Sequence, residues 1–525
     1  MIKLISLIAG VAIFLAALTV YIVPQQGGLN SSTSIEAQSL QGVKNIYLED
    51  LPIQETDLGR SGRSIFIAFT MLSHMLFANL HLGGAWIAVL VQLTFLRTRI
   101  PRYERLARSI TLFNVILFSF GATFAAAAMF FFIALYPTFS KNIFLLYWWP
   151  LFIEAFFFAV IIIFLYTFWF SWGKINPKTH LSLGFGYAVA VFIQTLAINS
   201  LASGMLSTGG NQIVWGDSGL LTQPLNVALS WWFNGTIWEL QFHRLGGSFA
   251  FFGSMLAMLA MFHYMDRKDH ASKVYWDWVG SYGLAWSLAG LVVQPMLGLI
   301  YMLAIQSSQA TAFIMIMHGP RAWEMLLVVG LLSAQFLSIM IYFADRRETI
   351  LTQIETRRLS KLLKIFLVIG ALSGIILIQP SWLGAMNIGD PSALLNPLGP
   401  MSYKYVGLFT LVIIGALLLM MDIFILGDVK NQDWGNMSRV SRWAAVSAGI
   451  FGMWTLITMG YVRESARAPW LVYNIMPAPG QMNYPTPIPM WQIFAVWAVS
   501  LALAVATFWL VSKVTAEHPE KAEEI

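Results

Sequence analysis

The sequence contains no cysteine. Disulfides, iron–sulfur clusters, thiolate metal sites and covalently attached c-type haem are therefore excluded within this chain. Charge is also scarce, since 11% of the 525 residues are charged, whereas soluble domains carry about 25%. Glycine-rich phosphate loops and nucleic-acid-binding motifs are absent as well. We therefore expect no nucleic-acid partner, and we attribute the net charge of +6 to membrane topology.

Long apolar runs dominate the chain, and 58% of its residues are hydrophobic. A membrane-spanning helix needs about 20 mostly apolar residues. The sequence therefore predicts an all-α, polytopic membrane helix bundle with about twelve transmembrane helices in the lipid bilayer. We interpret the first run as a retained anchor, because it is longer than most signal-peptide cores. The expected spans are 4–23, 63–96, 107–136, 145–172, 180–206, 241–264, 278–305, 319–344, 361–384, 403–427, 442–463 and 490–512.

Lysines and arginines are distributed unevenly between the two sides of this arrangement. If the N-terminus lies in the cytoplasm, most of the 31 basic residues fall in inner segments, as in the run from Arg97 to Arg108. The positive-inside rule then predicts a multi-pass protein of the bacterial cytoplasmic (inner) membrane with both termini in the cytoplasm. Two expected outer loops, 207–240 and 471–489, are rich in Gly and Trp or in Pro. They fit either an interfacial rim with a rigid linker or a docking surface for an outward-side partner.

Ionisable side chains inside a bilayer are costly, so each one needs a physical reason. Four histidines are expected at the inner surface, in contact with water: His180, His263, His270 and His518. The other four histidines and four glutamates lie in spans or at their outer ends: His74, His81, His243, His318, Glu154, Glu239, Glu324 and Glu464. Positions far apart in the chain thus bring polar atoms to a similar depth in the outer half of the bundle, which is the main functional signal.

Haem iron is one centre that uses His and Met without Cys, while proton relays and ion sites are the alternatives. His74 and His81 are seven residues apart and share one helix face. Gly83 and Gly84 would admit either a flat ring or a closely packed helix. The pair could ligate haem iron or another metal, or it could form hydrogen bonds across a helix interface.

The remaining candidates are ambiguous when taken singly. Glu154 could be a protonated structural group or an acid on a proton path. Met325 alone would be read as core packing. Glu464 and Arg467 are i, i+3 neighbours that could form an interfacial ion pair closing the helix.

The eleventh expected span is followed by the segment Glu464-x-x-Arg467-x-Pro469-Trp470. This segment is similar to the Glu-x-Gly-Arg-Gln-Pro-Trp signature of subunit I of cytochrome bd-type oxidases. The resemblance covers about 63–344 and 442–512. The other matching features follow in the family's order: His74 with Leu76-Phe77 and Leu82-Gly83, Pro150-Leu151-x-x-Glu154, then His243 and Met325.

The resemblance implies a haem-b-containing oxidoreductase of the terminal-oxidase type, with up to three haems, one of which could be haem d. His243 and Met325 would be the axial ligands of a low-spin haem b. His74 and Glu464 would each bind the iron of one further haem, and Arg467 would pair with a haem propionate. Glu154 would lie beside the reactive haem or on its proton route, so that Glu154 and Glu464 are the catalytic candidates. His81 and His318 are added as cofactor-binding candidates, although they are not family positions.

The chain also departs from the family pattern. Only about Ser307 to Met317 is available where the long quinol-binding loop should lie, and Ile162 replaces a second acid. The arginine expected just before the ligand methionine is missing, and Arg321 or Arg244 could substitute for it. We therefore expect electrons to be exchanged with a periplasmic c-type cytochrome docked on the outer loops.

Four regions follow from the comparison with the family plan. Residues 1–62 form a membrane anchor and an outward polar segment, and 63–344 form the first part of a haem-binding bundle. Residues 345–441 contain two inserted helices, and 442–525 complete the bundle and form a cytoplasmic tail. The chain would be one of several membrane subunits of a respiratory complex.

Two other functions fit parts of the pattern. One is a haem electron relay or quinone-linked membrane anchor without oxygen chemistry. The other is a secondary transporter, which would show paired repeats with broken helices near the midplane. Gln294-Pro295 is the one hint of a broken helix, and it has no counterpart elsewhere in the sequence.

Overall fold

The computed structural model describes residues 59–207, 234–318, 322–353, 357–380, 397–399, 401–421, 434–467, 470–473 and 476–477, and scattered positions between 495 and 509. The expected anchor at 4–23 lies outside the described residues. The expected span at 490–512 is described only at those scattered positions. Most of the two expected outer loops also lies outside.

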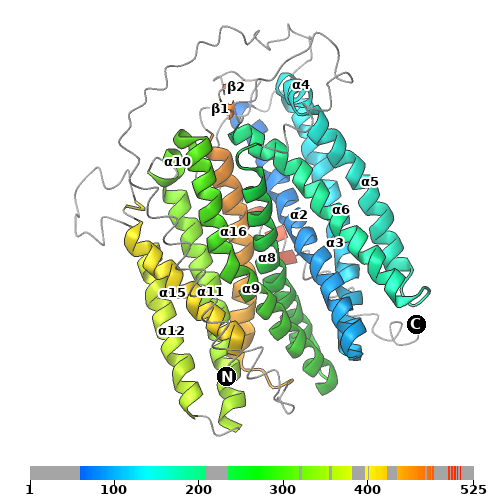
Figure 1. Cartoon of the computed structure of the whole chain (residues 1–525), viewed down its shortest axis with the longest axis vertical. Helices are drawn as coiled ribbons and strands as arrows, with labels where there is room; N and C mark the ends of the chain where they lie inside the picture. Colours follow the sequence, from blue (N-terminus) through cyan, green and yellow to red (C-terminus); the bar gives the residue numbers. More distant parts are fainter. Residues whose placement is uncertain are drawn as a thin grey trace. The chain divides into compact units, whose positions relative to one another are not determined.

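Ten helices in the described part of the chain are long and apolar enough to cross a membrane (Figure 1). Each coincides with one of the expected spans between 63 and 463, so the prediction of a polytopic helical bundle is confirmed. They are α2 (Gly59–Thr98), α3 (Pro101–Leu135), α5 (Trp148–Phe170), α6 (Pro177–Leu206), α8 (Ile237–Asp266), α9 (His270–Ser308), α11 (Ala322–Gln353), α12 (Arg357–Ile378), α15 (Ser402–Met421) and α16 (Arg439–Ser465).

Short elements lie at one end of this bundle. They are the helices α4 (Pro137–Leu146) and α10 (Ala310–Met317) and a small antiparallel pair of strands, β1 (Trp470–Val472) and β2 (Met476–Pro477). We call this end of the bundle the α10 end. The opposite end carries the turn between α2 and α3, and we call it the arginine end because Arg97, Arg99 and Arg102 lie there.

Local sequence explains where several helices begin at the arginine end. Pro101 and Pro177 occupy the first positions of α3 and α6, where a missing backbone N–H costs nothing. The side chain of Asn176 accepts a hydrogen bond from Lys178 N (2.9 Å), and Asp269 accepts one from Ser272 N (2.8 Å). The hydrogen bonds from Ser272 hold the pKa of the Asp269 carboxyl below its ordinary value.

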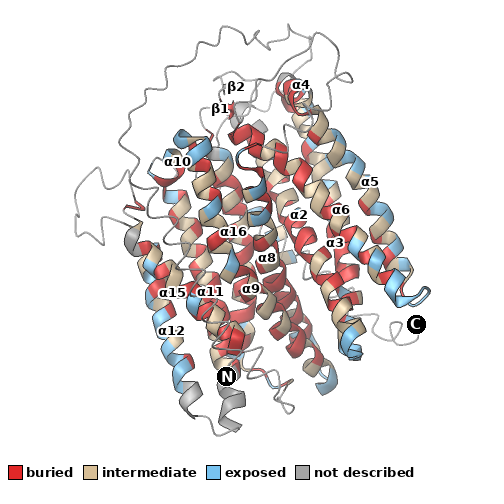
Figure 2. Cartoon of the chain, in the orientation of Figure 1, coloured by how far each residue is buried: buried red, intermediate tan, exposed pale blue. Residues whose placement is uncertain are grey.

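Helix α8 is the centre of the bundle, with 72% of its most apolar stretch buried (Figure 2). Glycines allow its neighbours to approach closely. A Cβ added at Gly290 of α9 would lie 2.4 Å from Ala250 N, and one added at Gly83 of α2 would lie 2.2 Å from Ser248 O. Of the two alternatives for Gly83 and Gly84, the structure shows the closely packed helix.

A buried ion pair fastens the beginning of α16 at the arginine end. Arg346 Nη2 lies 2.9 Å from Asp277 Oδ2, and the two side chains are 1% and 0% exposed. The same carboxylate oxygen accepts a hydrogen bond from Gly435 N (2.8 Å), and Tyr264 donates to Gly435 O (2.6 Å). Gly435 has a φ of +94°, which favours glycine. Helices α8, α9 and α11 are thus tied to the segment that leads into α16.

Two histidines at the arginine end differ from expectation. His180 and His263 were expected to contact water, but they are 3% and 4% exposed. His180 Nε2 donates to Phe168 O (2.9 Å), and its ring packs against Trp172 at 4.5 Å. The His263 ring stacks on Trp276 at 4.0 Å. Large aromatic side chains cover both rings, which position along the chain did not indicate.

Candidate functional site

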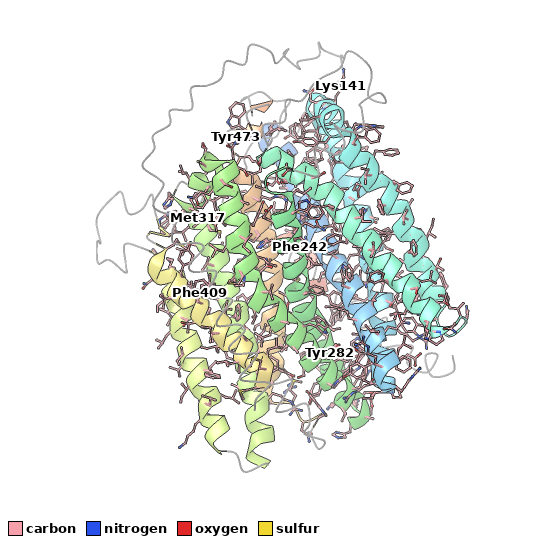
Figure 3. All side chains as sticks on the ribbon, in the orientation of Figure 1. Lys141, Phe242, Tyr282, Met317, Phe409 and Tyr473 are labelled. Carbon is pink, nitrogen blue, oxygen red and sulfur yellow. The ribbon has the colours of Figure 1, made fainter. Side chains whose placement is uncertain are left out.

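Candidate residues that lie far apart in the sequence gather in the half of the bundle nearest the α10 end. Glu154 and His243 lie within the first two turns of α5 and α8, Met325 lies in the first turn of α11, and Glu464 is in the last turn of α16. Alternating helix direction brings these ends together. Figure 3 shows Met317 and Tyr473 at the α10 end and Tyr282 toward the opposite end.

One ring nitrogen of His74 forms a hydrogen bond, and the other is available as a ligand. Its Nδ1 donates to Gly121 O of α3 at 2.9 Å, and because a carbonyl oxygen only accepts, the proton is on Nδ1. Nε2 therefore carries the lone pair. Metal-bound histidines usually have this arrangement, with the second nitrogen oriented by a carbonyl or carboxylate. Arg244 is near enough to act electrostatically on this imidazole.

His81 has a different environment. It is 6% exposed, and the buried Tyr187 hydroxyl of α6 lies 3.1 Å from its Nε2 and 3.3 Å from its Nδ1. The ring also packs against Phe118 of α3 at 5.4 Å. The structure thus shows the hydrogen bond across a helix interface, and a cofactor role for His81 stays a prediction.

We expect Tyr187→Phe to destabilise the protein without changing its cofactor content. The substitution leaves a buried imidazole nitrogen without its partner, which costs about 1–3 kcal/mol. Thermal unfolding of the purified protein measures the cost, with Tyr166→Phe at a less buried position as the control. If Tyr187→Phe instead lowers the haem-to-protein ratio at unchanged thermal stability, His81 belongs to the cofactor site.

His243 faces α9. Gln294 Nε2 lies 3.1 Å from each of its ring nitrogens, and the Tyr301 ring stacks on it at 5.7 Å and 28°. A Cβ added at Gly298 would lie 3.3 Å from His243 Cε1. The Gln294-Pro295 pair therefore has a local explanation: the glutamine of this proline-interrupted stretch of α9 contacts the histidine.

Met325 is half-buried and packs against an apolar cluster that includes Leu240 and Tyr301. Leu240 lies one turn before His243 on α8, and Tyr301 is the residue whose ring stacks on His243. His243 and Met325 are therefore both next to this apolar cluster. His318 differs from them: it is exposed at the end of α10, and its ring packs on Phe313 at 6.3 Å.

Two arginines pair with one carboxylate at the end of α16, and a third lies nearby. Arg463 Nη2 donates to Glu464 Oε1 at 2.7 Å, and Arg467 pairs with Glu464 Oε2, so the expected i, i+3 ion pair is present. Arg244 of α8 is near enough to act electrostatically on the same carboxylate. Burial lowers the pKa of Arg467, which lies beyond the end of the span, and the Glu464 charge opposes this shift. The positive charge of the three guanidinium groups therefore exceeds the single negative charge of the Glu464 carboxylate.

Polar side chains in the bundle hold Arg244 in place. Its guanidinium donates to Asn199 Oδ1, and Asn199 Nδ2 donates to Gln241 Oε1 at 2.6 Å. Asn199 and Gln241 are completely buried. Sequence reasoning did not identify these two amides, although uncharged polar residues inside spans are the signal that would have found them.

Several buried polar atoms in this region have no hydrogen-bond partner among the described residues. They are Nε of Arg463 and of Arg467, the hydroxyl of Tyr301 and Oε1 of Gln294. Each such atom costs about 1–3 kcal/mol. Surplus guanidinium charge with free donor atoms fits a bound group that carries carboxylates, and an imidazole and a thioether nearby fit an iron porphyrin.

Glu154 lies apart from the arginines. Gln194 Nε2 of α6 donates to its Oε1 at 2.9 Å. One turn further along α5, Phe158 stacks on Phe118 of α3 at 5.0 Å. Glu154 is thus on a side of α5 that faces α3 and α6, and it is linked through aromatic rings to the environment of His81.

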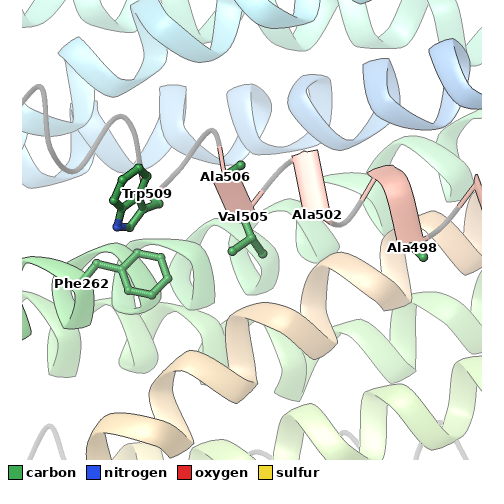
Figure 4. A pocket seen from close by; sticks show the side chains of 6 residues that line it. All are labelled: Phe262, Ala498, Ala502, Val505, Ala506 and Trp509. Atoms are coloured by element: carbon green, nitrogen blue, oxygen red, sulfur yellow. The ribbon is translucent and has the colours of Figure 1, made fainter.

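A groove elsewhere in the bundle is too remote to belong to this site. It is apolar and lies between Phe262 of α8 and the segment containing Ala498, Ala502, Val505, Ala506 and Trp509 (Figure 4). Phe262 follows His243 by 19 residues, or about 28 Å along a helix.

Comparison with known proteins decides the family. The model of "Cytochrome bd terminal oxidase subunit I" matches residues 63–519. The chain belongs to this family. The bd subunit I family binds haem, and the ten spans are consistent with a membrane-embedded subunit of a respiratory oxidase type.

A solved bd oxidase structure, from Geobacillus thermodenitrificans, is similar over 87% of this chain and 98% of that one, with 16% identity and a TM-score of 0.47. No curated protein matches the chain. Groups of three or more potential metal ligands were not found among the described residues.

Proposed function

We propose that the chain is a haem-b-containing subunit of a respiratory electron-transfer complex in the bacterial inner membrane, with its haem sites near the outer face. The observation that carries the proposal is the stacking of His243 on Tyr301, a member of the apolar cluster against which Met325 also packs, with surplus guanidinium charge near Tyr301. Haem supplies reversible one-electron chemistry at its iron.

His243 and Met325 would close both axial positions of a low-spin haem b, which suits electron transfer. Gln294 and Tyr301 would fix the plane of the His243 ring through the contacts described above. Methionine ligation would raise the reduction potential. Arg467 and Arg463 would hold propionates as planar donors.

His74 and Glu464 would each bind iron of one further haem, and one of these could be haem d. The hydrogen bond to Gly121 O would keep Nε2 of His74 unprotonated and oriented. Glu154, held by Gln194, would exchange protons with the reactive haem, because a neutral carboxylic acid can remain inside a bilayer. Other membrane subunits and a periplasmic c-type cytochrome would complete the electron path.

One observation favours the electron relay as a second candidate. Both oxygens of Glu464 are engaged by Arg463 and Arg467. Each oxygen keeps a second lone pair, but two guanidinium partners neutralise the charge that makes a carboxylate a good iron ligand. If Glu464 does not bind iron, the protein would transfer electrons without oxygen chemistry.

Carbon monoxide binding to the dithionite-reduced complex separates these functions. The oxidase predicts a carbon monoxide difference spectrum that His74→Ala abolishes, together with oxygen consumption that Glu464→Ala abolishes. The relay predicts a haem spectrum that carbon monoxide leaves unchanged. A purified complex that contains no haem would rule out both the oxidase and the electron relay.

We expect Met325→Leu to keep the protein folded and to alter the low-spin haem spectrum. Leucine is close to methionine in volume, so packing should cost less than about 1.5 kcal/mol. Loss of the thioether would lower the reduction potential of the low-spin haem, measured by redox titration. The control is Met302→Leu, which replaces another methionine that packs against the same apolar cluster. An unchanged spectrum and potential in Met325→Leu would point to His318 as the ligand.

A further inference from the structure

The arginine end carries a row of guanidinium groups on aromatic rings. Arg102 lies over Trp278 with its Cζ 4.7 Å from the ring centre, and Arg105 lies over Tyr275 at 4.1 Å. Trp278 and Tyr275 belong to α9, whereas both arginines belong to the first two turns of α3. The rings are buried and the arginines exposed. Each guanidinium is therefore held on a rigid platform with its N–H groups open to a ligand.

Among the described residues, no carboxylate forms an ion pair with this row, which consists of Arg97, Arg99, Arg102, Arg105 and Arg108. Glu104 lies among them, but it accepts a hydrogen bond from Trp172 Nε1 at 3.3 Å. The row is thus a concentrated positive charge where α3 enters its apolar stretch.

An aromatic column continues from this charge along α9 into the span. Trp278 packs on Tyr282 at 5.5 Å, and Tyr282 meets Trp286 at 6.4 Å. Trp286 stacks on Phe249 of α8 at 5.7 Å. Tyr282, Trp286 and Phe249 are only half-buried. Positive charge at the membrane surface and a partly open apolar column beneath it are the two features that a lipid with an anionic headgroup requires.

We propose that Arg102 and Arg105, on their Trp278 and Tyr275 platforms, bind the phosphate of an anionic phospholipid whose acyl chain lies along Tyr282 and Trp286. Guanidinium groups match phosphate as planar, two-pronged donors. Stacking keeps the side chains in one conformation, so less conformational entropy is lost when the lipid binds. The site is independent of the haem-binding region, which lies toward the α10 end.

The test is titration of the purified full-length protein in mild detergent with phosphatidylglycerol, followed by native mass spectrometry. The unmodified protein should bind this lipid more tightly than phosphatidylcholine. Arg102→Gln/Arg105→Gln should weaken phosphatidylglycerol binding about 25-fold, about fivefold for each basic residue removed. Arg97→Gln/Arg99→Gln removes the same charge from exposed arginines without aromatic platforms, and it should weaken binding less than about fivefold.

Two further measurements complete the test. The first distinguishes the effect of charge from that of donor geometry, and the second distinguishes a bound lipid from free phosphate. Arg102→Lys/Arg105→Lys keeps the charge and should give an intermediate affinity, because ammonium groups lack the planar donor geometry. Millimolar inorganic phosphate should not displace the lipid. Equal losses in the stacked and unstacked glutamine variants would overturn the proposal, and so would lysine variants that bind as well as the unmodified protein. Displacement by inorganic phosphate would overturn it in favour of a free-anion site.

Discussion

Replacing His243 by alanine is expected to abolish the low-spin component of the reduced-minus-oxidised spectrum and to remove about one haem per chain. The imidazole is the stronger of the two proposed axial ligands, and a thioether alone holds haem iron weakly. The substitution should leave the fold intact, because the half-buried ring borders Gly298 and Tyr301 rather than the packed centre of α8. Haem extraction and redox spectroscopy of the purified protein measure both effects.

A control and a rescue make this result specific. His180→Ala deletes another buried histidine at the opposite end of the bundle, and it should keep every haem. Added imidazole should enter the space left by His243→Ala and restore the low-spin spectrum, which a merely structural histidine would not do. A His243→Ala protein with unchanged haem content and spectrum would contradict the assigned ligand.

Replacing Asp277 by alanine is expected to destabilise the protein by about 3–5 kcal/mol, because it removes the carboxylate that pairs with the buried Arg346 guanidinium. The carboxylate also accepts the hydrogen bond from Gly435 N, so the segment leading into α16 would lose one of its ties as well. Chemical denaturation in detergent micelles measures the loss. The Arg346–Trp434 contact, with Cζ 5.0 Å from the ring centre, would remain.

A second substitution distinguishes the ion pair from general damage. Asp277→Ala combined with Arg346→Met removes both charges and should recover part of the lost stability. Asp269→Ala, which removes an exposed helix-capping carboxylate eight residues earlier, should have a much smaller effect. If Asp277→Ala costs no more than Asp269→Ala, the buried pair does not fasten α16 as described.

The fold was largely predictable, because the requirement for a span is local: about 20 apolar residues without charge. For the same reason the Glu464–Arg467 pair was predictable, since its partners are one turn apart. The partners of Arg244 were not predictable, because Asn199 lies 45 residues away in the sequence and approaches Arg244 only when α6 packs on α8. His180 shows a similar limit: the Trp172 ring that covers it becomes visible only in three dimensions.

In the candidate site, too, some features were predictable from the sequence, whereas others depend on contacts between distant helices. The resemblance to the bd subunit I family implied His74, His243, Met325 and Glu464 as a set, and the fold brings them to one half of the bundle. The details that decide chemistry depend on other helices. Gly121 of α3 accepts the hydrogen bond from Nδ1 that orients the His74 ring, and Gln294 and Tyr301 of α9 contact His243. Their roles as iron ligands remain predictions.

A redox difference spectrum of the purified protein, combined with haem extraction, tests the central claim most directly. The proposed function predicts b-type haem with a low-spin component that disappears in His243→Ala and shifts in potential in Met325→Leu. A folded, purified protein that carries no haem at all would contradict the claim.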